Sequence, residues 1–490
     1  MNEEKKHSLL SRMAYGAADI YGGGAFVVIS TFYTVFLTKA QGMPAAMAGT
    51  IPLIGKVWDA VTDPIMGNIC DRTKSKFGAK RFYILVGSLL SALTFILMWI
   101  TAPFATMTSK YVFYAAMYML FSTGFTVVMV PYNGLLPDMV DDYTERSRYS
   151  SVRMMFSTFG AILAGLIPTI LIKDNTNPTP YLIVALIFGA IFTVTILWTF
   201  FGTWEKQKEP IRVPLKDSFT QSFTVYKSKA FRMFIAIFLL GQGAADFVTG
   251  LAVYYVDDVL NAYGGGNFTI LMGVLLVAQF AGTIIFGQIM QRTSKTFPIL
   301  VGFPVRIAAT LAMLLFSHEG ANFTIILILS FIVGLGMAAS STSIYAILSD
   351  MADVDELITS VSRPGTCSGM ATFIRKIATG LSSAIIGLLL GMIGYDEVLA
   401  NSGMRQAASV QHGIAYIYIF VPVLLMVLTI LVARKYPLQK KEFEIIKKEI
   451  ARRKGEESSE ITEEEKAVCE NVTGFAFTDL WNRDNAIRLK

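Results

Sequence analysis

Residues 89–100 read Leu-Leu-Ser-Ala-Leu-Thr-Phe-Ile-Leu-Met-Trp-Ile, a stretch that is apolar on every side of a helix. The stretch lies inside a longer run, residues 82–109, that contains no Asp, Glu, Lys or Arg. A strand of a transmembrane β-barrel would instead alternate apolar and polar residues over about ten positions. Because about 20 apolar residues cross a bilayer as a helix, this run predicts a transmembrane helix.

Further runs without charged residues follow along the chain. They cover residues 111–137, 175–203, 259–291 and 320–349. The composition agrees with them, since 53% of the 490 residues are hydrophobic and only 16% are charged, whereas soluble chains carry about 25% charged residues. We therefore expect an all-α polytopic membrane protein that has the lipid bilayer as a partner.

The same pattern argues against several other classes of protein. No stretch outside the apolar runs is long enough to form a catalytic domain, and no nucleophile–base set is visible, so we do not expect an enzyme. The three cysteines, Cys70, Cys367 and Cys469, are too scattered for a disulfide framework or a metal cluster. We expect no cofactor and no nucleic-acid partner.

Hydropathy and its charged interruptions predict twelve transmembrane helices, six before a polar gap and six after it. The predicted spans lie near residues 12–39, 44–70, 81–103, 110–136, 148–172, 179–203, 231–258, 267–291, 297–317, 322–348, 366–394 and 411–436. The chain then divides into an N-terminal six-helix half (1–203), a cytoplasmic linker (204–230), a C-terminal six-helix half (231–436) and a cytoplasmic tail (437–490).

Positive charge predicts the orientation of these spans. Most Lys and Arg residues of the connections gather on one side, and the other side holds Lys39, Lys110, Lys173 and Arg405. Because positively charged connections stay in the cytoplasm, we expect a multi-pass protein of the cell membrane with both termini inside.

The tail carries a weaker pattern. Its apolar residues Phe443, Ile445, Ile446 and Ile450 predict one amphipathic helix. That helix is either regulatory or simply solvated or lying along the membrane surface.

Three short stretches recur at matching places in the two sets of six helices. Gly-Ala-Ala-Asp occurs at 16–19 and 243–246, residues 67–73 resemble 287–293, and Pro-Asp-Met-Val-Asp at 137–141 matches Ser-Asp-Met-Ala-Asp at 349–353. This duplication predicts two pseudo-symmetric six-helix halves, the major facilitator fold, in which substrate sites lie near the membrane midplane between the halves.

Charged residues inside the second span indicate a binding site. Lys56, Asp59 and Asp63 are three and four residues apart, which places them on one helical face. Two carboxylates one turn apart repel each other unless a proton or cation lies between them, and Thr62 adds a neighbouring oxygen. We therefore predict a monovalent-cation site at Asp59 and Asp63. The alternative is a Lys–Asp pair that merely joins helices.

Other charged residues leave more than one interpretation open. Asp19 and Asp246 occupy matching places in the first and seventh spans, where each could bind a sugar hydroxyl or a proton, or cap a helix. Lys376, at the start of the eleventh span, could face the cavity as a partner for the acidic residues, or extend to the membrane surface.

The connections near 71–81 and 138–148 are dense in charge. We expect them to form salt bridges that close the cytoplasmic mouth, although simple positive-inside anchoring would give a similar pattern. The predicted gating residues are Asp71, Arg72, Asp138, Arg146 and Arg363.

Residues 58–67, Trp-Asp-Ala-Val-Thr-Asp-Pro-Ile-Met-Gly, follow closely after Lys56. This segment resembles the second-helix signature of the glycoside–pentoside–hexuronide:cation symporters, the melibiose permease family. The likeness continues through 71–81, Val130-Pro131-Tyr132 and Arg375-Lys376, and it covers nearly the whole chain except the tail.

The resemblance implies roles for individual residues. It places a sodium, lithium or proton site at Asp59, Asp63, Thr62 and Thr126, with Thr62 standing where melibiose permeases carry an asparagine. It places the solute site at Asp19, Met129, Tyr132, Asn133, Arg153 and Lys376.

The chain departs from melibiose permease within the predicted solute site. Ala18, Met129 and Asn133 stand where that protein has a lysine, an aspartate and a tryptophan that stacks on the sugar. The cation part of the site therefore matches the family, whereas galactoside specificity does not carry over.

The function predicted from the sequence is cation-coupled import of a sugar, glycoside or uronide by alternating access, driven by sodium or protons. Two alternatives remain: a cation-coupled carrier of a less polar amphiphile such as a lysolipid, and a membrane sensor or scaffold that transports nothing.

Overall fold

The computed structural model describes residues 8–174, 176–206, 218–262, 266–396, 399 and 404–486. These residues form two compact units. Unit 1 comprises Met1–Arg232, Ala346–Lys376 and Lys440–Lys490, and unit 2 comprises Met233–Tyr345 and Ile377–Gln439. Much of the predicted linker, residues 207–217, lies outside the described residues.

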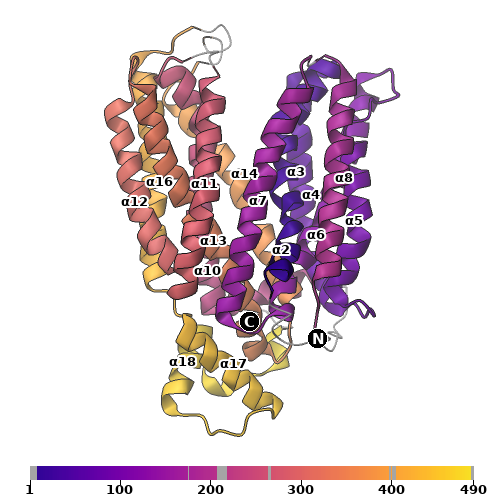
Figure 1. Ribbon diagram of the computed structural model, residues 1–490, viewed down its shortest axis with the longest axis vertical. Helices are drawn as coiled ribbons and strands as arrows, with labels where there is room; N and C mark the ends of the chain where they lie inside the picture. Colours follow the sequence, from indigo (N-terminus) through magenta and orange to yellow (C-terminus); the bar gives the residue numbers. More distant parts are fainter. Residues whose placement is uncertain are drawn as a thin grey trace. The chain divides into compact units, whose positions relative to one another are not determined.

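Helices make up nearly all of both units (Figure 1). The first part of the chain contains α2 (Leu9–Ala17), α3 (Asp19–Val28), η1 (Ile29–Tyr33), η2 (Phe36–Ala40), α4 (Ala45–Arg72), α5 (Ala79–Leu97), α6 (Met107–Met139), α7 (Tyr143–Leu171), α8 (Pro178–Gly202), α9 (Ser218–Ser222) and η4 (Phe223–Lys227). The second part contains α10 (Lys229–Tyr254), η5 (Tyr255–Val259), α11 (Asn267–Arg292), α12 (Phe297–Met313), η6 (Leu314–Phe316), α13 (Phe323–Thr359), α14 (Pro364–Met392) and α16 (Ala408–Arg434). The tail contains α17 (Lys440–Lys454), α18 (Glu463–Thr473), η7 (Phe477–Asp479) and η8 (Arg483–Ala486).

Ten helices of the described chain are long and apolar enough to cross a membrane. Two further predicted spans complete the twelve. One is α4, which is 28 residues long but carries the charged residues Lys56, Asp59 and Asp63 in its middle. The other is the first span, which is divided into α2, α3 and two short π-helical segments, η1 and η2.

The first span is interrupted at Ala18 by a side chain from α8. The Thr199 hydroxyl accepts a hydrogen bond from the Ala18 amide at 2.9 Å and donates to the Ala14 carbonyl at 2.6 Å. A continuous α-helix would pair this amide and carbonyl directly, so the inserted hydroxyl accounts for the break. As a result Asp19 is the first residue of α3 and lies buried in unit 1.

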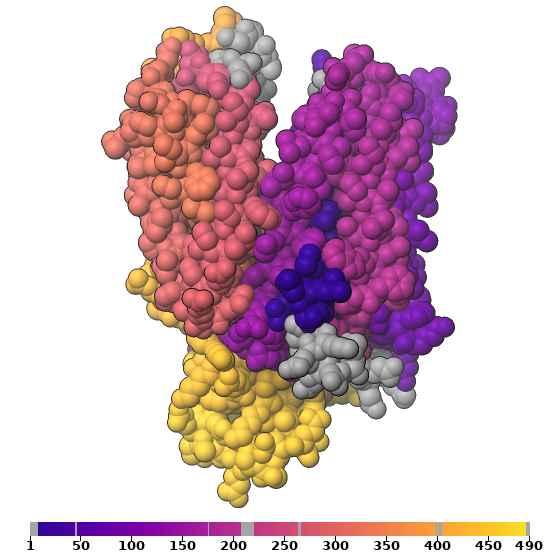
Figure 2. All heavy atoms as spheres, viewed as in Figure 1, coloured from indigo at the N-terminus to yellow at the C-terminus, as the bar shows by residue number. Residues whose placement is uncertain are grey.

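Two elements differ from the sequence prediction. Helix α13 continues to Thr359, well past the predicted end of that span near residue 348, because its last polar turns are buried within unit 1. The tail holds two helices and two short turns instead of one amphipathic helix. In the space-filling view the yellow tail packs against the end of α7 (Figure 2), where the rings of Tyr143 and Phe443 lie 5.6 Å apart.

Candidate functional site

Two carboxylates of α4 and one lysine of α14 form a buried acidic cluster. The Lys376 ammonium lies 3.0 Å from Asp59 Oδ2 and 2.9 Å from Asp63 Oδ2. The two aspartates are 2% and 0% exposed, so water does not screen these charges. Lys376 is therefore the charge partner that one interpretation of the sequence predicted, and it does not extend to the membrane surface.

A hydroxyl from α6 completes the cluster. Thr126 donates a 2.7 Å hydrogen bond to Asp63 Oδ1. Asp59 Oδ1 is buried and makes no well-aligned hydrogen bond among the described residues, and the Ser122 hydroxyl of α6 lies close to Asp59. When both carboxylates are ionised and the ammonium is charged, the cluster carries a net charge of −1.

Two residues predicted near this cluster lie elsewhere. The Thr62 hydroxyl donates to the Trp58 carbonyl at 3.2 Å and contacts the Asp59 carbonyl at 3.5 Å, a back-bond to the preceding turn that threonine often makes in helices. Its oxygen is therefore directed at the backbone of α4 and not at the carboxylates. Lys56 is half-buried and makes no ion pair among the described residues. The Lys–Asp contact that joins helices here is made by Lys376, between α14 and α4.

A second buried cluster joins α3, α6 and α7. Arg153 donates to Asp19 Oδ2 at 3.0 Å, to Asp19 Oδ1 at 3.4 Å and to Asn133 Oδ1 at 2.6 Å. The guanidinium lies over the Tyr132 ring, 4.6 Å from its centroid. The break at Ala18 places Asp19 where Arg153 can reach it.

Met129 completes this second cluster on its apolar side. A side chain added at Gly22 would come within 2.2 Å of Asp19 Oδ1 and 2.6 Å of Met129 Cε, so the thioether lies close to the same carboxylate. All five predicted solute-site residues other than Lys376 thus meet in one place. Together they offer an anion, a cation, an amide and an aromatic ring.

At one end of unit 1, Asp71 of α4 caps α14. Its carboxylate accepts hydrogen bonds from the Gly365 amide at 2.9 Å, the Thr366 amide at 2.7 Å and the Thr366 hydroxyl at 2.9 Å. A carboxylate in this place satisfies free amides and interacts favourably with the helix dipole. The first half of the sequence is thereby bonded to the eleventh span.

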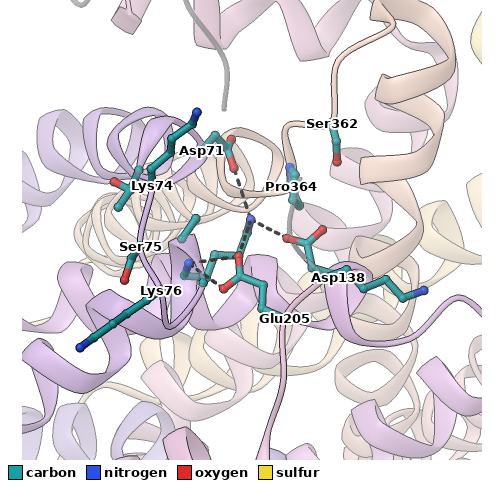
Figure 3. A pocket seen from close by; sticks show the side chains of 13 residues that line it. Asp71, Lys74, Ser75, Lys76, Asp138, Glu205, Ser362 and Pro364 are labelled. Carbon is teal, nitrogen blue, oxygen red and sulfur yellow. Dashed lines mark hydrogen bonds and ion pairs between the residues drawn. The ribbon is translucent and has the colours of Figure 1, made fainter. Parts of the chain in front are cut away.

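Lys80 links three acidic side chains beside this cap. Its ammonium lies 2.6 Å from Asp138, 3.6 Å from Asp71 and 3.9 Å from Glu205. In Figure 3 the three carboxyl groups point toward this common nitrogen at the edge of a hollow of about 640 Å³, to which Ser362 and Pro364 also contribute.

Glu205 caps α5 in the same way that Asp71 caps α14. It accepts hydrogen bonds from the amides of Lys80 and Arg81 at 2.9 and 3.1 Å. Gly78 has a φ of +100° and leaves room for this contact, since a side chain there would come within 2.3 Å of Glu205 Oε2. Burial raises the pKa of Glu205 above its ordinary value, and the Lys80 ammonium offsets part of that rise.

Arg146 of α7 connects the two copies of the repeated segment. It lies 3.2 Å from Asp350 and 2.5 Å from Asp353 on α13, and it donates to the Ser349 carbonyl at 2.9 Å. It also donates to the Val140 carbonyl at 2.7 Å. This arginine therefore joins the end of the first repeat to the second repeat.

Arg363 and Arg72 complete the set of predicted gating residues. Arg363 forms a two-bond contact with Asp355 at 2.7 and 2.9 Å and donates to the Thr224 hydroxyl at 3.0 Å. Arg72 is half-buried at the end of α4. We call Asp71, Lys80, Asp138, Arg146, Glu205, Asp350, Asp353, Asp355 and Arg363 the gate network.

The sequence did not single out Lys80, Glu205 or Asp355 as members of this network. Lys80 and Glu205 are 125 residues apart, so no local spacing could join them. A partial signal existed for Asp350 and Asp353, because they lie in the second copy of the Pro-Asp-Met-Val-Asp repeat.

Known proteins resemble this chain over nearly its whole length. A sequence profile of the family described as MFS/sugar transport protein matches residues 14–440. The uncharacterized symporter YjmB of Bacillus subtilis is 27% identical over 403 residues, which cover 80% of this chain and 85% of that protein. The glucuronide carrier protein homolog of Escherichia coli is 26% identical over 449 residues, which cover 90% and 95% of the two chains.

Solved structures support the same architecture. The proton:xylose symporter XylE bound to 6-bromo-6-deoxy-D-glucose aligns with a TM-score of 0.65 at 10% identity, over 90% of this chain and 97% of that one. This likeness confirms the predicted fold class, an all-α bundle of twelve spans with the major facilitator architecture.

Proposed function

We propose a cation-coupled sugar symporter, and we start from the fact that the chain belongs to the MFS/sugar transport protein family. Members of this superfamily are multi-pass membrane transporters and not enzymes. Within that frame, we propose that the chain imports a sugar, glycoside or uronide together with one sodium ion or proton across the cell membrane, with both termini in the cytoplasm.

The observation that carries the proposal is that two buried carboxylates, Asp59 and Asp63, share a single ammonium. A buried negative charge without a partner is costly in a membrane-embedded site. One monovalent cation would neutralise the cluster, and both Asp59 Oδ1 and the Thr126 hydroxyl are oxygen donors of the kind that small hard cations prefer. The residues therefore fit one sodium ion or one proton.

The charge of Lys376 sets how many cations the acidic cluster binds. With the lysine charged, two carboxylates need one additional positive charge, not two. The loaded cluster is neutral and the empty one is not, so the loaded protein passes through an occluded state at lower free energy. Cation binding and solute binding are then coupled, because both shift the same conformational equilibrium.

The second cluster is the proposed solute site. Paired Asp19 and Arg153 present an acceptor and several donors to sugar hydroxyls, and Tyr132 offers an aromatic face. The relative named as a glucuronide carrier homolog makes a uronide a reasonable first ligand to test. Met129, which is apolar and close to Asp19, is the feature that favours the less polar amphiphile as a second candidate.

The gate network is the proposed cytoplasmic closure. Arg146 and Asp71 each bond residues of the first six spans to residues of the tenth or eleventh span. These bonds must break for that end to open, as alternating access requires.

The test measures accumulation and exchange in vesicles for Asp59→Asn and Asp63→Asn. We expect both variants to lose cation-driven accumulation of the solute, so that the inside-to-outside ratio falls to about 1, while solute exchange is partly retained. A panel of labelled uronides, glycosides and lysolipids identifies the cargo.

Each other outcome overturns a distinct part of the proposal. Full accumulation in either variant would remove the cation assignment. Uptake of lysolipid alone would establish the amphiphile carrier, and absence of counterflow with every solute would leave the sensor or scaffold.

A further inference from the structure

The tail is a folded segment that follows the part of the chain matched by the family profile, which ends at residue 440. Helix α17 buries Phe443, Ile446 and Ile450. It is tied to α18 by an ion pair of 2.8 Å between Arg452 and Glu465. Cys469 of α18 is 0% exposed, so the tail has an interior of its own.

The tail is attached to the gate network at several points. The Arg146 guanidinium lies over the Phe443 ring, 5.2 Å from its centroid. The Trp481 amide donates to the Leu357 carbonyl at 2.8 Å. Arg363 donates to the Ala486 carbonyl at 3.3 Å.

Lys447 makes a further contact between the two repeats, in addition to that of Arg146. Its ammonium lies 3.2 Å from Asp141 Oδ1 and 3.3 Å from Asp353 Oδ1. Asp141 is the last residue of the first Pro-Asp-Met-Val-Asp copy, and Asp353 is the last residue of the second copy. One ammonium from outside the repeats therefore bridges the two carboxylates that the duplication made equivalent.

We propose that Lys447 is a gating residue and that α17 is a latch, which stabilises the closed gate network by holding Asp141 and Asp353 together. The proposal rests on the function proposed above, because it assigns the latch to the same gate.

The physical reason is that this contact depends on the state of the gate. One ammonium can reach both carboxylates only while the segment before α7 lies beside the end of α13. Removing that ammonium leaves Asp353 paired with Arg146 but breaks this bridge to Asp141. An interaction made in one state and lost in the other shifts the equilibrium by its full free energy. Lys206 also pairs with Asp141, and this pair lies within the first half of the sequence.

The native cysteines report on the gate without any solute. Cys70 precedes Asp71, Cys367 follows Thr366, and both thiols are buried, at 0% and 1% exposed. Opening of the gate network should expose them to a maleimide, whereas Cys469 reports on the tail alone. Labelling of the purified full-length protein, followed by peptide mapping, gives a separate rate for each cysteine.

The variant that tests the latch is Lys447→Ala, and the matched control is Lys448→Ala. Lys448 is the next residue on the same helix and has the same charge, but it pairs with Glu465 inside the tail at 3.3 Å. We expect Lys447→Ala to label Cys70 and Cys367 about threefold faster, the effect of losing one partly exposed ion pair. We expect Lys448→Ala and Lys447→Arg to label these cysteines at the wild-type rate.

Any of three results would overturn the latch. The first is an unchanged labelling rate of Cys70 and Cys367 in Lys447→Ala. The second is an equal acceleration in Lys448→Ala, and the third is an acceleration in Lys447→Ala that includes Cys469, since either would show general loosening of the tail. Because labelling needs no solute, a failure to transport any sugar would refute the proposed function and leave the latch result standing.

Discussion

The Asp63 carboxylate has two partners, a hydroxyl from α6 and an ammonium from α14. The Thr126 hydroxyl donates to one of its oxygens and Lys376 pairs with both. Thr62 precedes Asp63 by one residue and has the same hydroxyl, yet that hydroxyl is bonded to the backbone of α4. Two threonines close to one carboxylate thus have different environments.

This difference gives a prediction at the scale of single residues. Thr126→Val keeps the shape of the side chain but removes the hydroxyl oxygen next to Asp63, which we propose as a ligand of the coupling cation. We expect the apparent affinity for the coupling cation to fall at least about tenfold. Thr62→Val should change it by less than about twofold, because no contact to the carboxylates is lost.

The measurement is the cation dependence of the melting midpoint in the purified protein, since a bound cation stabilises the fold in proportion to its affinity. An equal loss in both variants would return Thr62 to the cation site, and no loss in Thr126→Val would remove Thr126 from it.

Helices α4 and α14 approach each other so closely that side chains cannot lie between them. A side chain added at Gly67 would come within 2.5 Å of the Gly365 carbonyl oxygen, and one added at Gly369 within 2.8 Å of the Asp63 carbonyl oxygen. This contact lies between the Asp71 cap and the Lys376 pair. It therefore positions both of them.

At the scale of elements we predict that Gly67→Ala weakens the cap and the acidic cluster together. The added methyl group meets main-chain atoms, which cannot rotate away, so α14 has to shift. Overpacking of this kind costs about 1–3 kcal/mol. We expect a lower melting midpoint and a loss of cation-driven accumulation.

Gly49→Ala is the matched control, because Gly49 lies on the same helix with nothing within 4 Å of the added methyl group. Alanine is the better helix former, so that variant should be as stable as the parent or slightly more so. A harmless Gly67→Ala would show that α4 and α14 are not in close contact.

At the scale of the whole molecule, cation and solute binding should strengthen each other by the same factor. Reciprocity is a thermodynamic requirement for any two ligands that shift one equilibrium. Calorimetry of the solute with and without cation, and of the cation with and without solute, measures both factors. Unequal factors would indicate a third bound species, and factors of 1 would exclude coupling between the two clusters.

The sequence predicted the spans well because burial of a backbone in lipid requires long apolar runs, which are visible without knowledge of tertiary structure. It did not predict the last turns of α13, where Asp350, Asp353 and Asp355 are buried against partners from other elements. Hydropathy treats such residues as exposed, and only the fold brings their partners to them.

The candidate site likewise has parts that the sequence predicted and parts that only the fold brings together. The motif around Asp59 and Asp63 located the acidic cluster, and the resemblance brought Asp19, Asn133 and Arg153 to one place. The tail could not be anticipated beyond its amphipathic pattern, because its docking combines hydrogen bonds to main-chain groups of α13 with ion pairs between residues far apart in the sequence.

Lys376 is the last residue of its segment in unit 1, and Ile377 begins the next segment of unit 2, although both belong to the uninterrupted helix α14. Gly380 lies one turn after Lys376 and has open space around it, and a glycine makes a helix easier to bend at its position. A bend of α14 there would move the ammonium that balances Asp59 and Asp63.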